Sequence, residues 1–226
     1  MFHARPLFIG LCCAVLFAGS AAAAPADINS REVKLSYPQV YGLGEAGQKI
    51  NQFLFAEIDG FFAKTNAEFN KSSRQDLPPR KLAITVDHTV TFNESPLLSL
   101  TVNEWFFSGG AHPMSYLRAY TFDTRTGERL TLADLFRADA DYRSRLDEIM
   151  AAQIAERNIA IFSFTPFAGV KDNQEFYLTK EGLVVYYQLY EYTPYAAGFL
   201  RFPIPYAAVA DLLKADWLTI LAPPQP

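Results

Sequence analysis

Two short segments of the chain combine residue types that could bind a ligand or take part in a reaction. The first covers residues 107–113 and reads FSGGAHP, and the second covers residues 192–198 and reads YTPYAAG. Both interrupt an apolar alternation with glycine, which frees the backbone, and proline, which stiffens it, and such segments shape turns or present a surface. Neither offers the paired carboxylates, thiol or clustered metal ligands that catalysis would need. The sequence therefore favours a binding module over an enzyme.

Ser108 and His112 could be the nucleophile and the general base of a hydrolase. Such an enzyme holds its base within hydrogen-bonding reach of the serine and places an orienting acid behind the base. The run Ser108-Gly109-Gly110 lacks the G-x-S-x-G pattern of a nucleophile elbow, and nothing marks a third member. We therefore expect no catalytic residue here. A hydrolase of envelope polymers that uses an unrecognised site is the alternative function.

His88 and His112 are the two histidines outside the N-terminal leader described below. A hydrolytic zinc site normally takes three protein ligands, often two or three of them imidazoles at helical or strand spacing. These two are far apart, so we expect neither a metal site nor a cofactor. His88 fits a satisfied strand histidine. His112 lies beside Gly109 and Gly110, where it could contact a ligand next to a concave backbone nest, or simply cap the turn.

Tyr192, Pro194 and Tyr195 form the stronger interaction candidate. Tyrosine offers a large rigid contact area with a polar tip and is enriched at binding hot spots, and proline lowers the entropy lost on binding. The alternative is that the two tyrosines cover the edge of the core beneath a turn. The predicted binding residues are Ser108, Gly109, Gly110, His112, Tyr192, Pro194 and Tyr195.

Residues 1–24 are typical of a secretion signal. His3 and Arg5 give a short basic start, residues 7–17 are mostly apolar, and small residues follow up to Ala24. A membrane anchor is the alternative, but a spanning helix needs roughly 20 apolar residues, more than this stretch supplies. We therefore predict cleavage near Ala24, a periplasmic or secreted protein, and no membrane span afterwards.

The residue counts limit the classes of partner. Hydrophobic residues make up 50% of the chain and aromatic residues 15%, so about 200 residues can bury a bulky core in one large domain or two small ones. Cys12 and Cys13 leave with the signal, so we expect no disulfide. Without Arg5, 19 basic side chains face 24 acidic ones, a net charge of −5. This charge excludes nucleic acid as a partner, and suits either a basic protein partner or ordinary solubility.

Apolar spacing in the first half of the chain predicts one helix among several strands. Residues 31–37 alternate as a strand does, whereas residues 45–69 follow the helical period. Three further strands are expected at residues 82–92, 98–107 and 116–122. Their short connections favour an antiparallel meander. In the turn that follows, Gly127 is free to take positive φ.

The second half repeats the mixture of helix and strand. A helix is expected at residues 141–158 and a closing helix at residues 207–213. Strands are expected at residues 176–178, 183–187 and 199–204. The last strand should lie at an edge because Pro203 cannot donate to a ladder. The predicted class is therefore α+β, with antiparallel sheets and packed helices in two intimate subdomains, residues 30–122 and 123–214.

An ordered set of short motifs resembles a known pair of domains. The motifs are Ser108–His112, Tyr120–Asp123, Gly127–Glu128, Leu130–Phe136, Phe176–Leu183, Pro194–Gly198 and Ile204–Tyr206, preceded by Leu35–Val40 and Ile50–Asn51. In this order they resemble two adjacent bacterial exported domains of unknown function. That pair forms the extracellular region of RsiV-type lysozyme-sensing anti-sigma factors and the N-terminal region of PdaC-type peptidoglycan deacetylases.

The resemblance covers the chain from Arg31 to Leu213 and implies an α+β fold outside the cytoplasm. RsiV-type proteins also carry a sigma-binding segment and a membrane-spanning helix, and PdaC-type enzymes a separate metal-dependent deacetylase domain. We find none of these in the sequence, so we expect only a binding role to carry over. The implied partner is a lysozyme-like protein or a peptidoglycan fragment. A structural envelope protein without a ligand is a further alternative.

Overall fold

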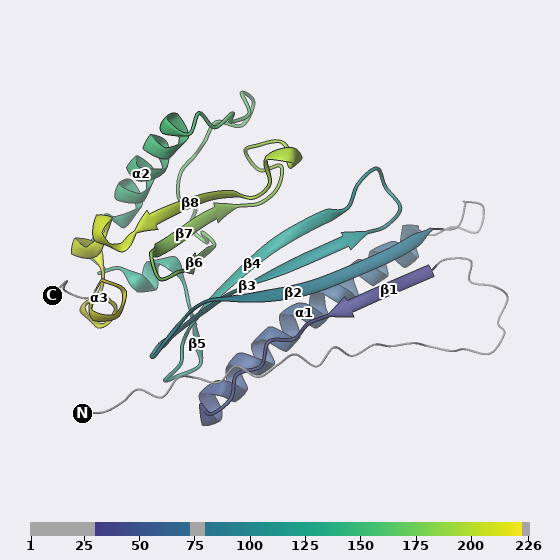
Figure 1. The fold of residues 1–226 in the computed structure, drawn as a ribbon, viewed down its shortest axis with the longest axis horizontal. Helices are drawn as coiled ribbons and strands as arrows, with labels where there is room; N and C mark the ends of the chain where they lie inside the picture. The colour runs from purple at the N-terminus through teal and green to yellow at the C-terminus, as the bar shows by residue number, and fades with distance from the viewer. Residues whose placement is uncertain (1–29, 73–79, 223–226) are drawn as a thin grey trace. The chain divides into compact units, whose positions relative to one another are not determined.

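The computed structural model describes residues 30–72 and 80–222. Within these ranges the chain forms three α-helices and two β-sheets, one of five strands and one of three (Figure 1). The predicted α+β class is therefore confirmed. The predicted signal peptide, residues 1–24, lies outside the described residues, as do both cysteines.

The five-stranded sheet is built from the first half of the chain. Its strands lie in the order β1 (Ser30–Leu35), β2 (Lys81–Glu94), β3 (Leu97–Phe107), β4 (Met114–Asp123) and β5 (Glu128–Leu130). β1 pairs with β2 in parallel, with Val33 opposite Ile84. The helix α1 (Gly44–Ser72) connects these two strands, and a parallel pair needs a long crossover of this kind. The strands predicted before and after α1 are confirmed.

The turn between β4 and β5 is the tight turn predicted at this position. Gly127 has φ +76° and donates its backbone N–H to the Asp123 carbonyl oxygen at 2.8 Å. The Asp123 side chain also accepts from the Arg125 backbone N–H at 2.9 Å. Hydrogen bonds with the Arg125 side chain hold the pKa of the Asp123 carboxyl below its usual range. A local sequence signal thus determines this turn.

The chain divides into two compact units. The N-terminal unit contains residues 30–72, 80–89 and 102–117, and the C-terminal unit contains residues 90–101 and 118–222. The strands β2, β3 and β4 contribute residues to both units, so the division does not fall at one point of the sequence. The predicted subdomain boundary between residues 122 and 123 stays a prediction.

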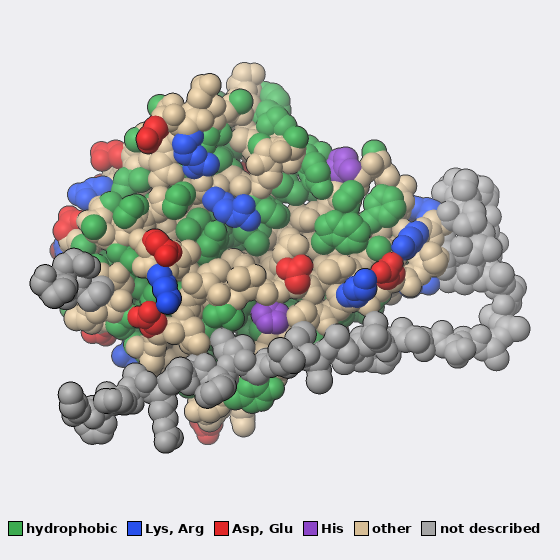
Figure 2. Space-filling model, in the orientation of Figure 1, with side chains coloured by type: hydrophobic (Ala, Val, Ile, Leu, Met, Phe, Trp, Pro, Cys, Tyr) green, Lys and Arg blue, Asp and Glu red, His purple; other side chains and the backbone are tan. Residues whose placement is uncertain are grey.

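Charged side chains of both signs are interspersed over the described part of the face shown in Figure 2. Lys34 and Lys81 each lie 3.0 Å from a carboxylate oxygen of Glu32. Hydrogen bonds from these two lysines lower the pKa of Glu32. Exposed pairs of this kind add little to stability. Their mixture of signs agrees with the mild net charge of the chain.

The helix α1 confirms the helix predicted at residues 45–69. Ile50, Leu54 and Ile58 follow one another at the helical repeat and are at most 1% exposed, so they form the buried stripe of the helix. The apolar residues Phe53, Phe61 and Phe62 of the same helix are only half-buried. The buried stripe is therefore narrower than the apolar stripe of the sequence.

The three-stranded sheet lies entirely in the C-terminal unit. Its antiparallel strands are β6 (Phe176–Leu178), β7 (Gly182–Tyr187) and β8 (Leu200–Pro205), with β7 in the centre. All residues of β7 are buried, whereas those of β8 alternate between buried and exposed. β8 is an edge strand, as Pro203 predicted.

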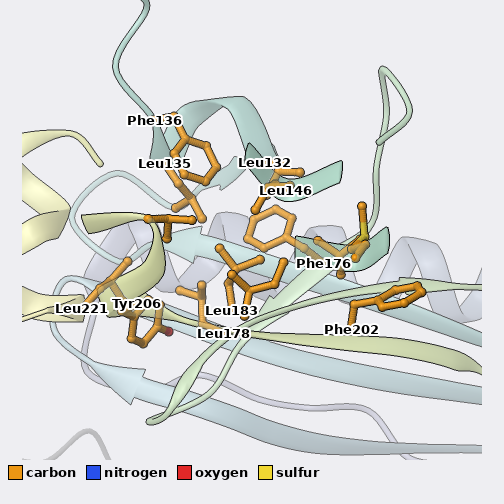
Figure 3. Close-up of a cluster of buried hydrophobic side chains, with 14 of the residues drawn as sticks. Leu132, Leu135, Phe136, Leu146, Phe176, Leu178, Leu183, Phe202, Tyr206 and Leu221 are labelled. Carbon is orange, nitrogen blue, oxygen red and sulfur yellow. The ribbon is translucent and has the colours of Figure 1, made fainter. Parts of the chain in front are cut away.

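A hydrophobic core packs this sheet against α2 (Tyr142–Glu156) and α3 (Ala215–Leu221), as Figure 3 shows. From α2 come Leu146 and Met150, and from β8 come Phe202 and Ile204, all fully buried. α2 confirms the helix predicted at residues 141–158. The core gives β7 and β8 a rigid base, and the loop between them starts and ends on that base.

The closing helix predicted at residues 207–213 is wrong. The chain there makes two 3₁₀ turns, Tyr206–Ala208 and Ala210–Leu212, separated by Val209 with φ −132°. This conformation accompanies full burial of the Val209 side chain, and such burial outweighs local helix propensity. The helix α3 comes later, where the indole N–H of Trp217 donates to the Asp134 carbonyl oxygen at 2.9 Å.

Candidate functional site

The first predicted binding segment is the hairpin loop between β3 and β4. The Arg80 side chain donates to the Ser108 carbonyl oxygen through Nε, at 3.0 Å, and through Nη2. Gly109 has φ +87°, a conformation that side chains other than glycine rarely adopt. Gly109, Gly110 and His112 are exposed. The segment is thus a surface turn held by its backbone.

The hairpin loop does not bring Ser108 and His112 together as nucleophile and base. His112 Nδ1 lies 2.8 Å from the carbonyl oxygen of Pro113, the next residue. Within the described chain, no hydrogen bond joins the Ser108 hydroxyl to His112. The ring nitrogen is oriented toward its own backbone, and the loop lacks the geometry of an activated serine.

A different serine and histidine do meet, in the N-terminal unit. Ser36 Oγ lies 2.9 Å from Nδ1 of His88. Burial lowers the pKa of His88, and a hydrogen bond with the Ser36 backbone partly opposes this effect. Among the described residues no carboxylate hydrogen-bonds the ring, so the pair lacks an orienting acid. His88 is therefore a satisfied strand histidine, as its position in the sequence suggested.

The second predicted segment is the loop between β7 and β8, and its three candidate residues have different surroundings. Tyr192 is 5% exposed, and its ring lies 5.0 Å from that of Tyr187 and 5.1 Å from that of Phe167. Pro194 is exposed. Tyr195 is half-buried on the surface. Tyr192 thus anchors the loop in the core, whereas Pro194 and Tyr195 lie at the protein surface.

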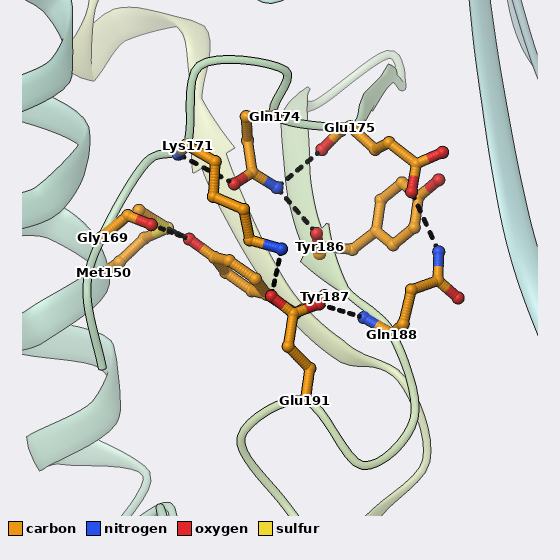
Figure 4. A network of polar contacts seen from close by, with 9 residues as sticks. All are labelled: Met150, Gly169, Lys171, Gln174, Glu175, Tyr186, Tyr187, Gln188 and Glu191. Carbon is orange, nitrogen blue, oxygen red and sulfur yellow. Dashed lines mark hydrogen bonds and ion pairs between the residues drawn. The ribbon is translucent and has the colours of Figure 1, made fainter. Parts of the chain in front are cut away.

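A network of polar contacts joins the β7–β8 loop to the segment between α2 and β6 (Figure 4). Glu191 forms an ion pair with Lys171 and accepts from the Gln188 backbone N–H at 3.1 Å. The Tyr187 hydroxyl donates to the Gly169 carbonyl oxygen at 2.7 Å. Burial raises the pKa of Tyr187, so the hydroxyl stays a donor at neutral pH. These contacts fix both segments relative to β7.

The segment after α2 lies beside this loop in Figure 1. α2 ends at Glu156 and is capped by Arg157, and Asn158 follows with φ +48°, which turns the chain away from the helix. The Phe162 backbone N–H then donates to the Tyr192 carbonyl oxygen at 2.9 Å. Two stretches distant in sequence are therefore joined through their backbones.

Between the two segments lies a cleft of about 480 Å³, which we call the loop cleft. Its lining residues are Arg157, Ile159, Ala160, Thr193, Pro194, Ala196, Ala197, Phe199 and Leu200. Most of them are small or apolar, and two are polar, Arg157 and Thr193. A concave apolar site with few polar groups is the usual form of a small-molecule site.

The two segments that form the loop cleft also carry exposed aromatic rings. Phe164 is 78% exposed and stacks on Phe162, with ring centroids 4.7 Å apart. Tyr190 is 46% exposed and packs on Tyr195 at 5.7 Å. Both pairs belong to the segments that form the cleft.

Of the residues that line the cleft, only Pro194 was among the predicted binding residues. Its neighbour Thr193 was not predicted, nor was the opposite wall with Arg157, Ile159 and Ala160. An apolar run at residues 159–162 directly after a charged helix end was the available signal, because such a run has no place in a helix or strand pattern. What it could not show is that this run meets the β7–β8 loop.

The described residues contain neither a cluster of metal ligands nor a membrane-spanning helix. No group of three or more His, Cys, Asp or Glu side chains in residues 30–72 and 80–222 could hold a metal ion. Over the same residues, no helix has the length and hydropathy to cross a membrane.

Two parts of the chain match known protein families. Residues 26–115 match the family described as deacetylase PdaC, and residues 133–207 match the family described as a protein of unknown function, DUF3298. Both members of the domain pair that the motifs indicated are therefore present in this chain. The likeness to RsiV-type proteins stays a prediction.

Two curated relatives are distantly similar. The peptidoglycan-N-acetylmuramic acid deacetylase PdaC of Bacillus subtilis is 22% identical over 179 residues, which cover 74% of this chain but only 38% of that protein. The immunogenic protein MPT64 of Mycobacterium tuberculosis is 22% identical over 162 residues, which cover 69% of this chain and 71% of that protein. The chain thus spans well under half of the deacetylase.

Solved structures show the same fold. A DUF3298 family protein from Pseudomonas aeruginosa matches with a TM-score of 0.66 and 16% identity, over 94% of this chain and 96% of that chain. Another member of the family, from Bacteroides fragilis, matches with a TM-score of 0.62 and 19% identity, over 94% and 95%.

Proposed function

We propose that this chain is a non-catalytic binding module of the bacterial cell envelope, periplasmic or secreted, which holds a fragment of peptidoglycan in the loop cleft. The observation that carries the proposal is the cleft itself. At about 480 Å³ it falls within the usual range of roughly 300–1,000 Å³ for small-molecule sites. A disaccharide or a short peptide has a suitable size.

The walls of the cleft are held in place before any ligand arrives. The Phe162–Tyr192 backbone hydrogen bond and the Lys171–Glu191 ion pair join the two segments. Tyr192 anchors one of them in the core. A preformed site loses little conformational entropy on binding, which favours affinity for a small ligand.

The link to peptidoglycan comes from the relatives. The PdaC family matches residues 26–115, and the curated relative of that name is a peptidoglycan deacetylase. Since this chain spans 38% of that enzyme, we carry over the cell-wall setting and not the deacetylation. A binding role fits the cleft, whose lining contains no carboxylate or histidine that could act as a base.

The test uses soluble fragments from digested peptidoglycan and the purified protein in a calorimeter. Ala197→Trp places a large ring in the cleft and should weaken binding at least tenfold. Ala151→Trp changes an exposed alanine on α2, away from the cleft lining, and should bind as the wild type does. Chromatography of the fragments after incubation should show them unchanged.

Three results would contradict the proposal. If the wild type binds no fragment, the module does not recognise soluble peptidoglycan. If Ala197→Trp binds as tightly as the wild type, the ligand lies elsewhere. New products in the chromatogram would favour the envelope hydrolase instead.

A second candidate function is capture of a lysozyme-like protein, and the exposed aromatic rings favour it. Phe164 and Tyr190 present apolar surface of the kind found at protein hot spots. The acidic balance of the chain would speed encounter with a basic partner. Immobilised wild-type protein should then retain lysozyme from solution, and Phe164→Ser should retain much less. Equal retention by Phe164→Ser would exclude this surface.

A further inference from the structure

Thr193 is a buried polar side chain in the wall of the loop cleft. The residue is 2% exposed, and its hydroxyl has no hydrogen-bond partner among the described residues. A buried hydroxyl without a partner destabilises a protein, so its presence calls for a reason. Thr91 on β2 has the second such hydroxyl in the described chain, but it does not line the cleft.

Arg157 is the only cation among the residues that line the cleft. Its Nη1 donates to the Arg201 carbonyl oxygen at 2.8 Å and to the Gln153 side-chain oxygen at 3.3 Å. The guanidinium has five N–H donors, and no described residue accepts from Nε or Nη2. Only Nη1 therefore donates to the described protein, while the guanidinium lies over the Phe202 ring at 5.9 Å. The edge formed by Nε and Nη2 can donate to a carboxylate in the two-point geometry that arginine favours.

Arg145 on α2 offers a comparison, because its guanidinium is paired with a carboxylate of the chain itself. Its Nη1 donates to the Ala208 carbonyl oxygen at 3.0 Å and lies 3.5 Å from an Asp211 carboxylate oxygen. Arg145 thus has an acidic partner within the chain. Arg157 has none among the described residues.

The remaining lining restricts the body of the ligand. Ala160, Ala196, Ala197 and Pro194 offer small apolar surfaces, suited to methyl groups. None of the lining residues is acidic, so an anion meets no repulsion from the walls. A ligand with a small aliphatic body and a negative end fits this lining.

We infer that the loop cleft binds the carboxylate end of a short alanine-ended peptide. Arg157 pairs with the terminal carboxylate, Thr193 hydrogen-bonds the adjoining amide, and the alanine methyl groups pack on the small apolar residues. The inference rests on the proposed function, because short alanine-containing peptides are a component of peptidoglycan. It selects the peptide part of the polymer over the sugar part.

The first experiment compares N-acetyl-D-alanyl-D-alanine with the same peptide as its C-terminal amide, by calorimetry. The wild type should bind the acid at least tenfold more tightly than the amide. Arg157→Gln should lose this preference, and Arg145→Gln should keep it. Equal affinity of the wild type for acid and amide would overturn the inference, as would an unchanged preference in Arg157→Gln.

The second experiment removes the hydroxyl and keeps the shape of the side chain. Thr193→Val should raise the melting temperature of the free protein, because an unpaired buried hydroxyl is lost, and should weaken binding of the acid several-fold. Thr91→Val should also raise the melting temperature and leave binding unchanged. A Thr193→Val protein that melts earlier, or that binds like the wild type, would contradict the role given to Thr193.

Different results would reject the peptide inference and the proposed peptidoglycan-binding function. Binding of sugar-containing fragments without binding of the dipeptide acid would reject the inference and leave the peptidoglycan module in place. Binding of neither would reject both.

Discussion

The β3–β4 hairpin loop and the β7–β8 loop resemble each other in sequence but differ in what lies against them. Both combine glycine or proline with aromatic or imidazole groups. The hairpin loop is held by Arg80 at the Ser108 backbone, and its glycines and His112 are exposed. The β7–β8 loop has a second segment joined to it, and a cleft lies between them. A loop of suitable composition becomes a candidate site when another part of the chain completes a concave surface with it.

The largest effect expected from this comparison concerns Tyr192 and Tyr195. Tyr192→Ala removes a ring packed on Tyr187 and Phe167 and should lower the free energy of unfolding by about 3–5 kcal/mol, as large aromatic truncations do. Tyr195→Ala, at the surface, should lower it by less than about 1 kcal/mol. Urea unfolding of both variants measures the difference. If both variants lost a similar free energy of unfolding, Tyr195 would be as important to the core as Tyr192, and the distinction between the two residues would be wrong.

A smaller effect is expected in the hairpin loop at Gly109. Its φ of +87° makes Gly109→Ala costly by roughly 1–2 kcal/mol, the penalty for a left-handed backbone with a side chain. Gly110 has no such φ, and a methyl group there would meet only the His112 carbonyl oxygen at 4.0 Å. Gly110→Ala should therefore be close to neutral. Fragment binding should be unchanged in both, and a loss of binding in either would place a ligand at the hairpin.

Local signals in the sequence predicted most of the elements. The helix α1, the strands β2 to β4 and the edge position of Pro203 follow from periodicity and from single-residue chemistry. The prediction of a closing helix was wrong because burial of the Val209 side chain favours a non-helical backbone at that residue. The parallel pairing of β1 with β2 also depends on a long crossover and has no local signal.

The candidate site could be predicted only in part, because long-range contacts bring its two walls together and such contacts leave no local signal in the sequence. Pro194 and its neighbours were visible as a loop of unusual composition. Arg157 and Ile159 reach the cleft through long-range contacts such as the Phe162–Tyr192 hydrogen bond. Thr193 became a candidate only when its hydroxyl proved buried and unpaired among the described residues.

The pH dependence of stability tests His88, the half-buried histidine of the N-terminal unit. Burial lowers the pKa of His88 below its usual 6.5. The unfolded chain therefore binds more protons than the folded one below that pH, and stability falls as the pH drops from 6.5 through the lower folded pKa. His88→Gln should reduce this slope in unfolding measurements between about pH 5 and 7.5. An identical slope in the variant would show that His88 is not protected from protonation.

The smallest effects are expected where the sequence first suggested chemistry, at Ser108 and His112. Arg80 holds this surface turn through the Ser108 carbonyl oxygen, which both Ser108→Ala and His112→Ala keep. Each change should therefore alter the free energy of unfolding by no more than about 0.5 kcal/mol. Binding of peptidoglycan fragments should stay at the wild-type level, because neither residue lines the loop cleft. Calorimetry and chromatography of the fragments measure both properties on one preparation. If the wild type cleaves a fragment and either change abolishes cleavage, the hairpin loop is the functional site and the comparison between the two loops reverses.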